Sequence, residues 1–472
     1  MESRPLSWMM AGCAARVAAL PGNPPVRRVI TDSRAAGPGD LFIALRGERF
    51  DGHDFLPELA ERGIVAAVVS EAYRGMIPPG LTVLVVADPR TAYGQLAGHY
   101  RAEFDLPIVC VGGSNGKTTT KELIAAVLSA RFRTLKSEAS YNNDVGVPAT
   151  LFQLELTHTA AVLEAGTNHP GELAPLVRLI APQIGVLTSF GREHLEFFGD
   201  LAGVVREEGS LAEALPAGGT LVLDGDSDCA GTVAARVRPG VQVLRVGFAE
   251  TNDWVIRDLS QDWDGLTFRA ESVSHREWSG IWRVPLPGRH SAKNALCALA
   301  VAAVLGVNPA AARPALLNFH PPKQRLAVLR AGAVRVVDDT YNANADSMLA
   351  SLQTLTDLPC AGRRVAVLGD MGELGFMTET AHVEVGTATA EGVDALFAIG
   401  RFAETTVAAA RQAGHPHAQA FASIEAALPT LVNYLTEGDT VLVKASRSAR
   451  LERVVTYLRD RFEAPPPILA AA

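Results

Sequence analysis

The feature that most constrains this chain is a glycine-rich loop between an apolar run and an amphipathic segment. Residues 107–111 have the β-branched composition of a buried strand, and residues 118–128 have the apolar spacing of a helix. Between them lies Gly112-Gly113-Ser114-Asn115-Gly116-Lys117-Thr118. Glycines allow backbone amides to turn onto phosphate oxygens, and the helix N-terminus adds partial positive charge. The pattern therefore predicts a nucleotide phosphate site at the edge of a parallel sheet.

The side chains of this loop have separate predicted roles. We expect Lys117 to be an exposed loop residue that reaches the β- and γ-phosphates, and Thr118 to ligate Mg²⁺ through its hydroxyl. The other residues expected around the nucleotide are Gly113, Ser114, Asn115, Gly116 and Thr119. The strict eight-residue pattern requires glycine where Val111 stands, so a purely structural turn is the alternative. The loop alone is also typical of a GTPase switch or a motor.

The rest of the chain predicts several α/β domains. At 472 residues the chain is too long for one ordinary core. Short β-branched runs alternate with helical stretches, which favours parallel sheets covered on both faces. The predicted buried strands are 65–69, 83–86, 160–164, 184–188, 219–223, 334–338, 364–368, 395–399 and 440–443. Residues 253–283 alternate instead, which indicates an antiparallel extension of the sheet. Residues 318–322, with two prolines, are typical of a linker.

Composition excludes several classes of protein. A formal net charge of −8 and a pI near 5.8 argue against a nucleic-acid binder. The five cysteines include no Cys-x-x-Cys pair, which argues against a disulfide framework or a zinc knuckle and fits a reducing compartment. No apolar run reaches the roughly 20 residues needed to cross a bilayer, so we expect no membrane insertion. We expect a monomeric cytoplasmic protein.

The shortened loop followed by three threonines resembles the Mur ligase family, together with folylpolyglutamate synthetases. These enzymes use ATP to activate a carboxylate as an acyl phosphate and then form an amide. Residues 32–55 are similar to the uridine-nucleotide domain of the family. The resemblance implies that Ser33, Arg34 and Arg46 bind a UDP-muramyl peptide, and the two arginines suit a diphosphate. A surface turn is the alternative for this segment.

The resemblance implies an α/β fold of three domains. These are an N-terminal uridine-nucleotide domain (residues 1–104), a central phosphate-loop ATPase domain with a parallel sheet (105–317) and a C-terminal Rossmann-like domain (318–472). Residues 338–344 and 368–374 resemble the members that add D-alanyl-D-alanine to UDP-N-acetylmuramoyl-tripeptide in peptidoglycan synthesis. The Asp-Asn-Pro-Arg-type motif of the tripeptide-forming ligase is absent from the sequence. A ligase that adds the third amino acid, and a silent nucleotide-binding regulatory homologue, remain the alternatives.

The family pattern also assigns individual site residues. It implies that Glu164 and His194 hold Mg²⁺ beside the γ-phosphate, although a lone histidine after a strand is more often packed or capping. Arg325 is expected to neutralise the moving phosphoryl group, so Lys117, Glu164, His194 and Arg325 form the predicted catalytic set. Asn294 is expected beside the adenine and Asp339 at the ribose. The remaining expected substrate contacts are Asn142, Asn143, Tyr341, Asn342, Lys444, Ser446 and Arg447.

Glu208 marks a departure from the family. Most Mur ligases carry a lysine on the helix after the histidine motif, which carbon dioxide converts to a carbamate that helps bind a second Mg²⁺. Alignment places Glu208 at that position, and we expect it to be a permanent carboxylate ligand. Its side chain is shorter by about 3–4 Å, which a water or a shifted helix must bridge. The alternatives are a solvated acidic helix face with Glu207 and Glu213, or a one-residue shift that makes Glu207 the ligand.

Overall fold

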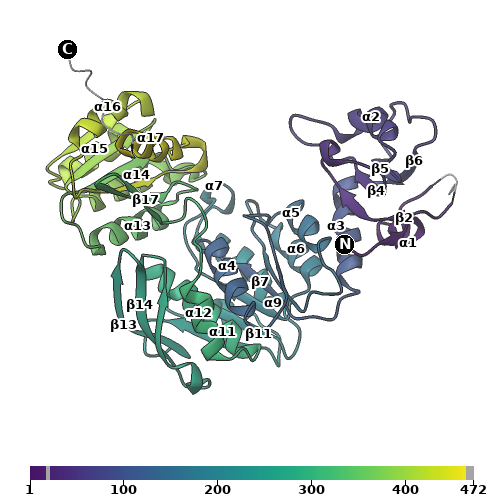
Figure 1. Cartoon of the computed structure of the whole chain (residues 1–472), viewed down its shortest axis with the longest axis horizontal. Helices are drawn as coiled ribbons and strands as arrows, with labels where there is room; N and C mark the ends of the chain where they lie inside the picture. The colour runs from purple at the N-terminus through teal and green to yellow at the C-terminus, as the bar shows by residue number, and fades with distance from the viewer. Residues whose placement is uncertain (18–21, 464–472) are drawn as a thin grey trace, which may run out of the picture.

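The computed structural model describes residues 1–17 and 22–463 and contains three α/β domains, each with a parallel sheet (Figure 1). The predicted fold class is therefore confirmed. The N-terminal and C-terminal domains lie at opposite ends of the molecule, with the central domain between them (Figure 1).

The N-terminal domain contains a four-stranded parallel sheet. Its order is β3 (Arg28–Ile30), β4 (Asp40–Ile43), β5 (Ala66–Ser70) and β6 (Thr82–Val86). A two-stranded antiparallel ribbon joins β1 (Arg4–Pro5) to β2 (Pro25–Val26). The helices are α1 (Leu6–Gly12), α2 (Leu56–Glu61) and α3 (Pro89–Arg101). The strand predictions at 65–69 and 83–86 are correct to within a residue, whereas β3 and β4 are too short to be recognised from their composition.

The central domain contains a nine-stranded mixed sheet. Its order is β15 (Gly280–Val284), β14 (Gly265–Ser272), β13 (Trp254–Asp262), β12 (Gln242–Gly247), β11 (Thr220–Asp224), β10 (Ile184–Leu187), β7 (Ile108–Gly112), β9 (Ala160–Glu164) and β8 (Thr134–Lys136). Strands β13, β14 and β15 pair antiparallel, as the alternating pattern of residues 253–283 predicts. The parallel strands β10, β7 and β9 are adjacent, so their carboxyl ends meet at one edge.

Helices cover both faces of the central sheet. They are α4 (Lys117–Leu128), α5 (Gly146–Leu151), α6 (Leu173–Ile180), α7 (Leu195–Phe198), α8 (Leu201–Glu208), α9 (Ser210–Ala214), α10 (Ala230–Ala234), α11 (Arg289–Val304) and α12 (Pro309–Leu317). The alanine-rich helix α11 packs closely on the sheet because its small side chains let the backbone approach. Trp254, Trp278 and Trp282 are buried in the same core.

The C-terminal domain contains a six-stranded sheet. Its order is β16 (Ala327–Ala331), β17 (Val334–Asp339), β21 (Thr440–Lys444), β18 (Arg364–Gly369), β19 (Ala395–Ile399) and β20 (Ala418–Phe421), with only β16 antiparallel. Its helices are α13 (Ala345–Asp357), α14 (Thr378–Ala388), α15 (Ala403–Gln412), α16 (Ile424–Tyr434) and α17 (Glu452–Glu463). Residues 318–322 between α12 and β16 form neither helix nor strand, which agrees with a linker.

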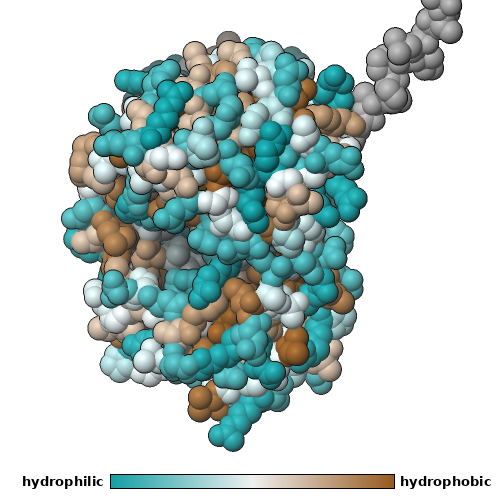
Figure 2. Space-filling view, turned by 90° about the vertical axis from the view of Figure 1, so that its left-hand side faces the viewer, coloured by the Kyte–Doolittle hydropathy of each residue, from teal (hydrophilic) through white to brown (hydrophobic). Residues whose placement is uncertain are grey.

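The two domain junctions differ in chemistry. One apolar core runs from the N-terminal sheet through α3 to one face of the central sheet, and it includes Ile43, Tyr93 and Ile180. The C-terminal domain has apolar clusters of its own on the two faces of its sheet. On the molecular face shown in Figure 2, hydrophobic residues form small groups among hydrophilic ones. In the described part of the chain, no helix is long and apolar enough to cross a membrane.

A buried arginine joins α3 to α6 at the first junction. Arg101 is 7% exposed, and its guanidinium donates to the carbonyls of Ile180 (2.9 Å), Ala181 (3.1 Å) and Phe104 (2.9 Å). Two of these carbonyls close the C-terminus of α6, where a positive charge is favourable. Burial lowers the pKa of Arg101, and Asp105 opposes that effect.

We predict that Arg101→Leu lowers the free energy of unfolding by about 2–4 kcal/mol, because three buried carbonyls lose a charged donor. Equilibrium urea unfolding followed by circular dichroism would measure the change. Arg178→Leu, at an exposed position on α6, is the matched control and should alter stability by no more than about 0.5 kcal/mol. Equal losses in the two variants would contradict a specific role for Arg101.

Candidate functional site

The phosphate loop follows β7 and has a backbone that needs glycine at two positions. Gly113 has φ +107° and Gly116 has φ +85°, both in the region that favours glycine. A Cβ at Gly113 would lie 2.6 Å from Thr188 Oγ1, and one at Gly116 would lie 2.8 Å from Asn294 Oδ1. Asn294, expected beside the adenine, therefore lies directly against the loop.

Lys117 lies beneath the loop instead of on its surface. Only 15% of its side chain is exposed, and Nζ donates to the carbonyls of Gly113 (2.6 Å) and Ser114 (3.2 Å). The expectation of an exposed lysine is wrong because α4 begins at Lys117, and side chains on a helix point back toward its N-terminus. Nζ is also 3.4 Å from Glu193 Oε2. Burial acts to lower the pKa of Lys117, but the carboxylates of Glu193, Glu208 and Glu164 outweigh it and raise the pKa.

Glu164 joins two sets of predicted residues. Its Oε2 accepts from the Thr118 hydroxyl at 2.9 Å, and its Oε1 accepts from Asn142 Nδ2 at 2.8 Å. The carboxylate is 1% exposed at the end of β9. The structure thus brings together two predicted metal ligands, Thr118 and Glu164, and one residue of the predicted substrate site.

The donor atoms of this region fit a magnesium ion. A carboxylate beside a hydroxyl is a hard oxygen set, which Mg²⁺ prefers when nucleotide phosphates complete its coordination. Across residues 1–17 and 22–463, no three His, Cys, Asp or Glu side chains converge as a metal site by themselves. His194 starts α7 with φ +48°, and its Nδ1 is 2.7 Å from Glu373 Oε2 without the alignment of a hydrogen bond. Its role as a ligand therefore stays a prediction.

Glu208 is buried against the phosphate loop. It is 1% exposed, and its Oε2 accepts from the Gly113 amide at 2.6 Å, while its Oε1 is buried without a hydrogen-bond partner. Burial raises the pKa of Glu208 to about 8, with Lys117 opposing and Glu193 adding to the shift. The alternative of a solvated acidic helix face is wrong, because α8 packs this side chain under the loop.

Glu207 has a separate structural role. It is 8% exposed, and its two carboxylate oxygens accept from the amides of Gly171 and Leu173, both at 2.8 Å. These contacts hold the chain at the N-terminus of α6. Because both oxygens are occupied there, the geometry favours Glu208 over Glu207 as the residue that serves the loop.

A second group of predicted residues gathers at the carboxyl ends of β17 and β21. Asp339 and Lys444 end these strands as direct neighbours, and Lys444 Nζ donates to Asp339 Oδ2 at 2.6 Å and to the Asn342 carbonyl at 2.9 Å. Burial acts to raise the pKa of Asp339, but Lys444 and Ser351 outweigh it and lower the pKa. Across the domain boundary, burial lowers the pKa of His290 to about 4, although Asp339 opposes the shift.

Two of the predicted cationic residues lie close to the ring of Tyr341. The Arg325 guanidinium lies 4.0 Å from the centre of its ring and that of Arg447 lies 5.8 Å away. The Tyr341 hydroxyl forms a hydrogen bond with Ser140 Oγ of the central domain. Ser446 is more enclosed, since its hydroxyl donates to the Asp370 carbonyl at 2.7 Å. The predicted phosphoryl and substrate cations therefore face the central domain from one side.

The remaining substrate residues lie elsewhere. Asn143 Oδ1 accepts from the Gly146 amide at 2.9 Å and so caps α5. Arg34 and Arg46 follow the adjacent strands β3 and β4 and are highly exposed, and they pair with Asp32 at 2.7 Å and with Asp51 at 3.8 Å. Ser33 opens a short 3₁₀ helix capped by Asp32, whose pKa the Arg34 guanidinium lowers to about 2.

The sequence patterns missed the contacts that hold the C-terminal domain to the loop. Arg192 donates to Asp346 Oδ1 from Nε (2.9 Å) and Nη2 (2.6 Å), and to Glu384 from Nη1 (2.7 Å) and Nη2 (3.0 Å). Asn344 Nδ2 donates to Asn115 Oδ1 of the loop at 3.0 Å. No local sequence pattern identifies Glu384 as a contact residue, because its partner is 192 residues away in the chain.

A short path connects this ion pair to the phosphate loop. The Arg192 amide donates to Asp346 Oδ2 at 2.7 Å, and the amide of the preceding residue, Gly191, donates to Ser114 Oγ at 2.9 Å. A Cβ at Gly191 would lie 2.8 Å from Asp346 Oδ2, so a larger residue would require this contact to shift. Hydrogen bonds thus run from Asp346 of the C-terminal domain through residues 191 and 192 to Ser114 of the loop.

The fold and the loop define an ATP-dependent ligase built on a phosphate loop. Three family models match the chain, with the descriptions "Mur ligase family, catalytic domain" over residues 25–101, "Mur ligase middle domain" over 111–302 and "Mur ligase, glutamate ligase domain" over 324–447. The chain belongs to the Mur ligase family.

Similar proteins narrow the comparison within the family. The UDP-N-acetylmuramoyl-tripeptide--D-alanyl-D-alanine ligase of Escherichia coli (strain K12) is 36% identical over 441 residues, which cover 92% of this chain and 93% of that protein. The ligase of the same description from Bacillus subtilis (strain 168) is 32% identical and covers 93% and 94%. Crystal structure I of MurF from Acinetobacter baumannii superposes with a TM-score of 0.90 at 30% identity, covering 98% of this chain and 99% of that chain.

We predict that Arg192→Ala slows ligation at least about tenfold, because a bidentate arginine pair holds the two domains in register. Small-angle scattering should show a larger radius of gyration for the variant. Arg453→Ala removes an exposed ion pair with Glu425 inside the C-terminal domain and is the matched control, with no change expected in either measurement. A wild-type rate and a wild-type radius of gyration in Arg192→Ala would contradict the role of Arg192 in holding the two domains together.

Proposed function

We propose that this chain joins D-alanyl-D-alanine to UDP-N-acetylmuramoyl-tripeptide with ATP, in peptidoglycan precursor synthesis. The observation that carries the proposal is a set of relatives with this activity in their names, 32–36% identical over more than nine-tenths of the chain. The segments that resemble the D-alanyl-D-alanine-adding members contain Asn344, Glu373 and Asp339. Asn344 and Glu373 contact the central domain beside the phosphate loop, and Asp339 accepts from Lys444.

The reaction would proceed in two steps. An oxygen of the terminal tripeptide carboxylate attacks the γ-phosphorus of ATP, and ADP leaves. The dipeptide amine then attacks the carbonyl carbon of the acyl phosphate, a tetrahedral intermediate forms, and inorganic phosphate leaves as the nitrogen loses a proton. The protein's contribution is positioning and charge neutralisation, for which Lys117 and Arg325 are the proposed cations. A solved MurF ligase from Thermotoga maritima in complex with ADP superposes with a TM-score of 0.81 at 26% identity, covering 93% of this chain and 98% of that chain.

We propose the remaining roles from the resemblance to the family, and the contact between Thr118 and Glu164 supports one of them. Thr118 and Glu164 would hold Mg²⁺, with His194 at the γ-phosphate side; when bound, the ion would neutralise charge on the phosphoryl oxygens. Ser33, Arg34 and Arg46 would take the uridine diphosphate. Five free thiols are typical of a reducing compartment and support a cytoplasmic location, and a monomer remains our expectation.

An acceptor panel tests the proposed function. Phosphate release should require both UDP-N-acetylmuramoyl-tripeptide and D-alanyl-D-alanine, and mass spectrometry should detect the amide product. Turnover with the UDP-dipeptide and a single diamino acid would instead identify the ligase that adds the third residue. Nucleotide binding without turnover for any pair of substrates would identify the silent homologue. A solved diaminopimelate ligase of the family is only 20% identical to this chain, which supports a shared fold alone.

We also propose that Glu208 supplies a carboxylate to the metal side of the loop, which a bound cation would keep deprotonated. Its Oε1 is buried without a partner, which costs free energy unless a ligand or water completes its contacts. The carboxylate lies close enough to Lys117 to affect the pKa of that residue, so it belongs to the same charge cluster as Glu164. A second cation beside the phosphates would satisfy this oxygen.

We predict that wild-type activity is indifferent to removal of carbon dioxide, because a glutamate needs no carbamate. Glu208→Gln should keep an acceptor for the Gly113 amide but lose charge, and should weaken Mn²⁺ binding in the presence of ADP by about 10–100-fold. Paramagnetic resonance of Mn²⁺ measures that affinity independently of turnover. Glu213→Gln, on the exposed face nearby, is the control. Full activity and unchanged Mn²⁺ affinity in Glu208→Gln would leave Glu208 with a loop-supporting role only.

A further inference from the structure

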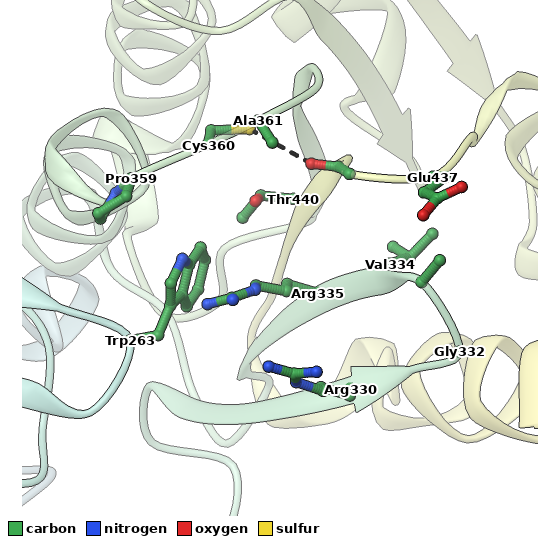
Figure 3. A pocket seen from close by; sticks show the side chains of 12 residues that line it. Trp263, Arg330, Gly332, Val334, Arg335, Pro359, Cys360, Ala361, Glu437 and Thr440 are labelled. Carbon is green, nitrogen blue, oxygen red and sulfur yellow. Dashed lines mark hydrogen bonds between the residues drawn. The ribbon is translucent and has the colours of Figure 1, made fainter.

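A cavity of about 600 Å³ lies where the central domain meets the start of the C-terminal sheet (Figure 3). Trp263 comes from the turn between β13 and β14, and Arg330, Arg335 and Thr440 come from the C-terminal sheet. Thr440 begins β21, whereas Lys444 of the nucleotide site ends it. The two sites are thus separated by the length of a strand, about 13 Å at 3.3 Å per residue.

Two arginines face this cavity from directly opposite positions. Arg330 on β16 and Arg335 on β17 are cross-strand partners in an antiparallel pair, so their side chains leave the same face. Figure 3 shows both guanidinium groups extending toward Trp263, and that of Arg335 lies 4.3 Å from the centre of the indole ring. Burial lowers the pKa of Arg335, and the nearby charge of Arg330 lowers it further. Like charges in this arrangement destabilise a sheet.

The surrounding acids leave this pair uncompensated. Among the described residues, neither arginine has a carboxylate oxygen within ion-pair distance. Asp264 on the hairpin acts to raise the pKa of Arg335, but its carboxylate forms its ion pair with Arg283, at 3.8 Å. Glu437 also lines the cavity and is exposed to solvent. Arg330 is exposed and Arg335 is partly exposed, so an incoming anion can reach both guanidinium groups. Neighbouring arginines without internal ion pairs are suited to bind phosphate or carboxylate groups.

Thr440 forms part of the cavity wall, between Cys360 and Arg335 (Figure 3). The residue is 1% exposed, and its Oγ1 is inaccessible to solvent and has no hydrogen-bond partner. This hydroxyl therefore lies behind the wall and is not a ligand contact. The volume is that of a pocket for a small organic molecule, which typically measures about 300–1,000 Å³.

We propose that this cavity binds a small anion with two or more phosphate or carboxylate groups. Arg330 and Arg335 would donate to its oxygens, and the indole of Trp263 would close one wall. Because Trp263 belongs to the central domain and the other residues to the C-terminal domain, a bound anion would contact both. It would therefore favour the domain arrangement in which this junction is closed.

Cys360 provides a direct reporter of occupancy. It lines the cavity and is partly exposed, and Cys229 in the central domain is exposed to a similar degree and serves as the internal control. The full-length enzyme would be treated with iodoacetamide at constant ionic strength, and peptide mass spectrometry would give the rate at each thiol. The probes are inorganic pyrophosphate and citrate, each at about 1–2 mM. This concentration would occupy half or more of the sites for a Kd of about 1 mM. Saturating MgADP fills the phosphate loop in all samples.

We expect one or both probes to slow alkylation of Cys360 at least about threefold while Cys229 is unchanged, and this protection should vanish in Arg330→Gln/Arg335→Gln. Protection by pyrophosphate alone or by citrate alone would identify the anion class. No protection, equal slowing at both thiols, or the same protection in the double variant would overturn the proposal.

Arg330→Gln alone relieves repulsion, so its thermal midpoint without probe should equal or exceed that of the wild type. A fall of several degrees would show a structural pair and also overturn the proposal.

Discussion

The structure depends on one buried cation held among three buried or nearly buried carboxylates. Lys117 lies under the phosphate loop, and the charges of Glu164, Glu193 and Glu208 all act on it. Buried charge is costly unless it is paired, and here negative charge exceeds positive charge. Burial is the main cause of the raised pKa of Glu208, at about 8, and the charge of Glu193 adds to it. Such a loop suits the nucleotide and divalent cation that we propose for it, because the cation would compensate the carboxylates and leave Lys117 for the phosphates.

The two junctions of the molecule suit different tasks. The N-terminal domain shares a continuous apolar core with the central sheet, and Arg101 fastens α3 to α6 across it. The C-terminal domain contacts the central domain through polar pairs that water can replace. These are Asp346 with Arg192, Asn344 with Asn115 of the loop, and Glu373 with His194. A junction of the second kind opens and closes at low cost. The N-terminal domain is thus joined to the central domain by a packed apolar core, whereas the C-terminal domain is joined to it by polar contacts.

Several elements were predictable because their signals are local. Strands such as β9 and β19 are short, largely apolar runs buried on both faces, and their bounds agree with the sequence prediction. The antiparallel pairing at 254–284 followed from alternation of polar and apolar residues. Strands β3 and β16 were missed, because a three-residue run or a half-exposed edge strand has no distinctive composition. The burial of Lys117 was missed because it depends on where α4 begins.

By itself, the sequence determined the nucleotide loop, the α/β class and the resemblance to a ligase family, because each is recorded in neighbouring residues. The alignment with the family also placed Glu208 where most members carry a lysine. Only the tertiary structure decided that Glu208 supports the loop while Glu207 caps α6, since adjacent residues on a helix face different neighbours. The same is true of Arg192 with Glu384 and of Arg330 beside Arg335. Those pairs depend on strand register and domain contact, which bring together residues that no local pattern links.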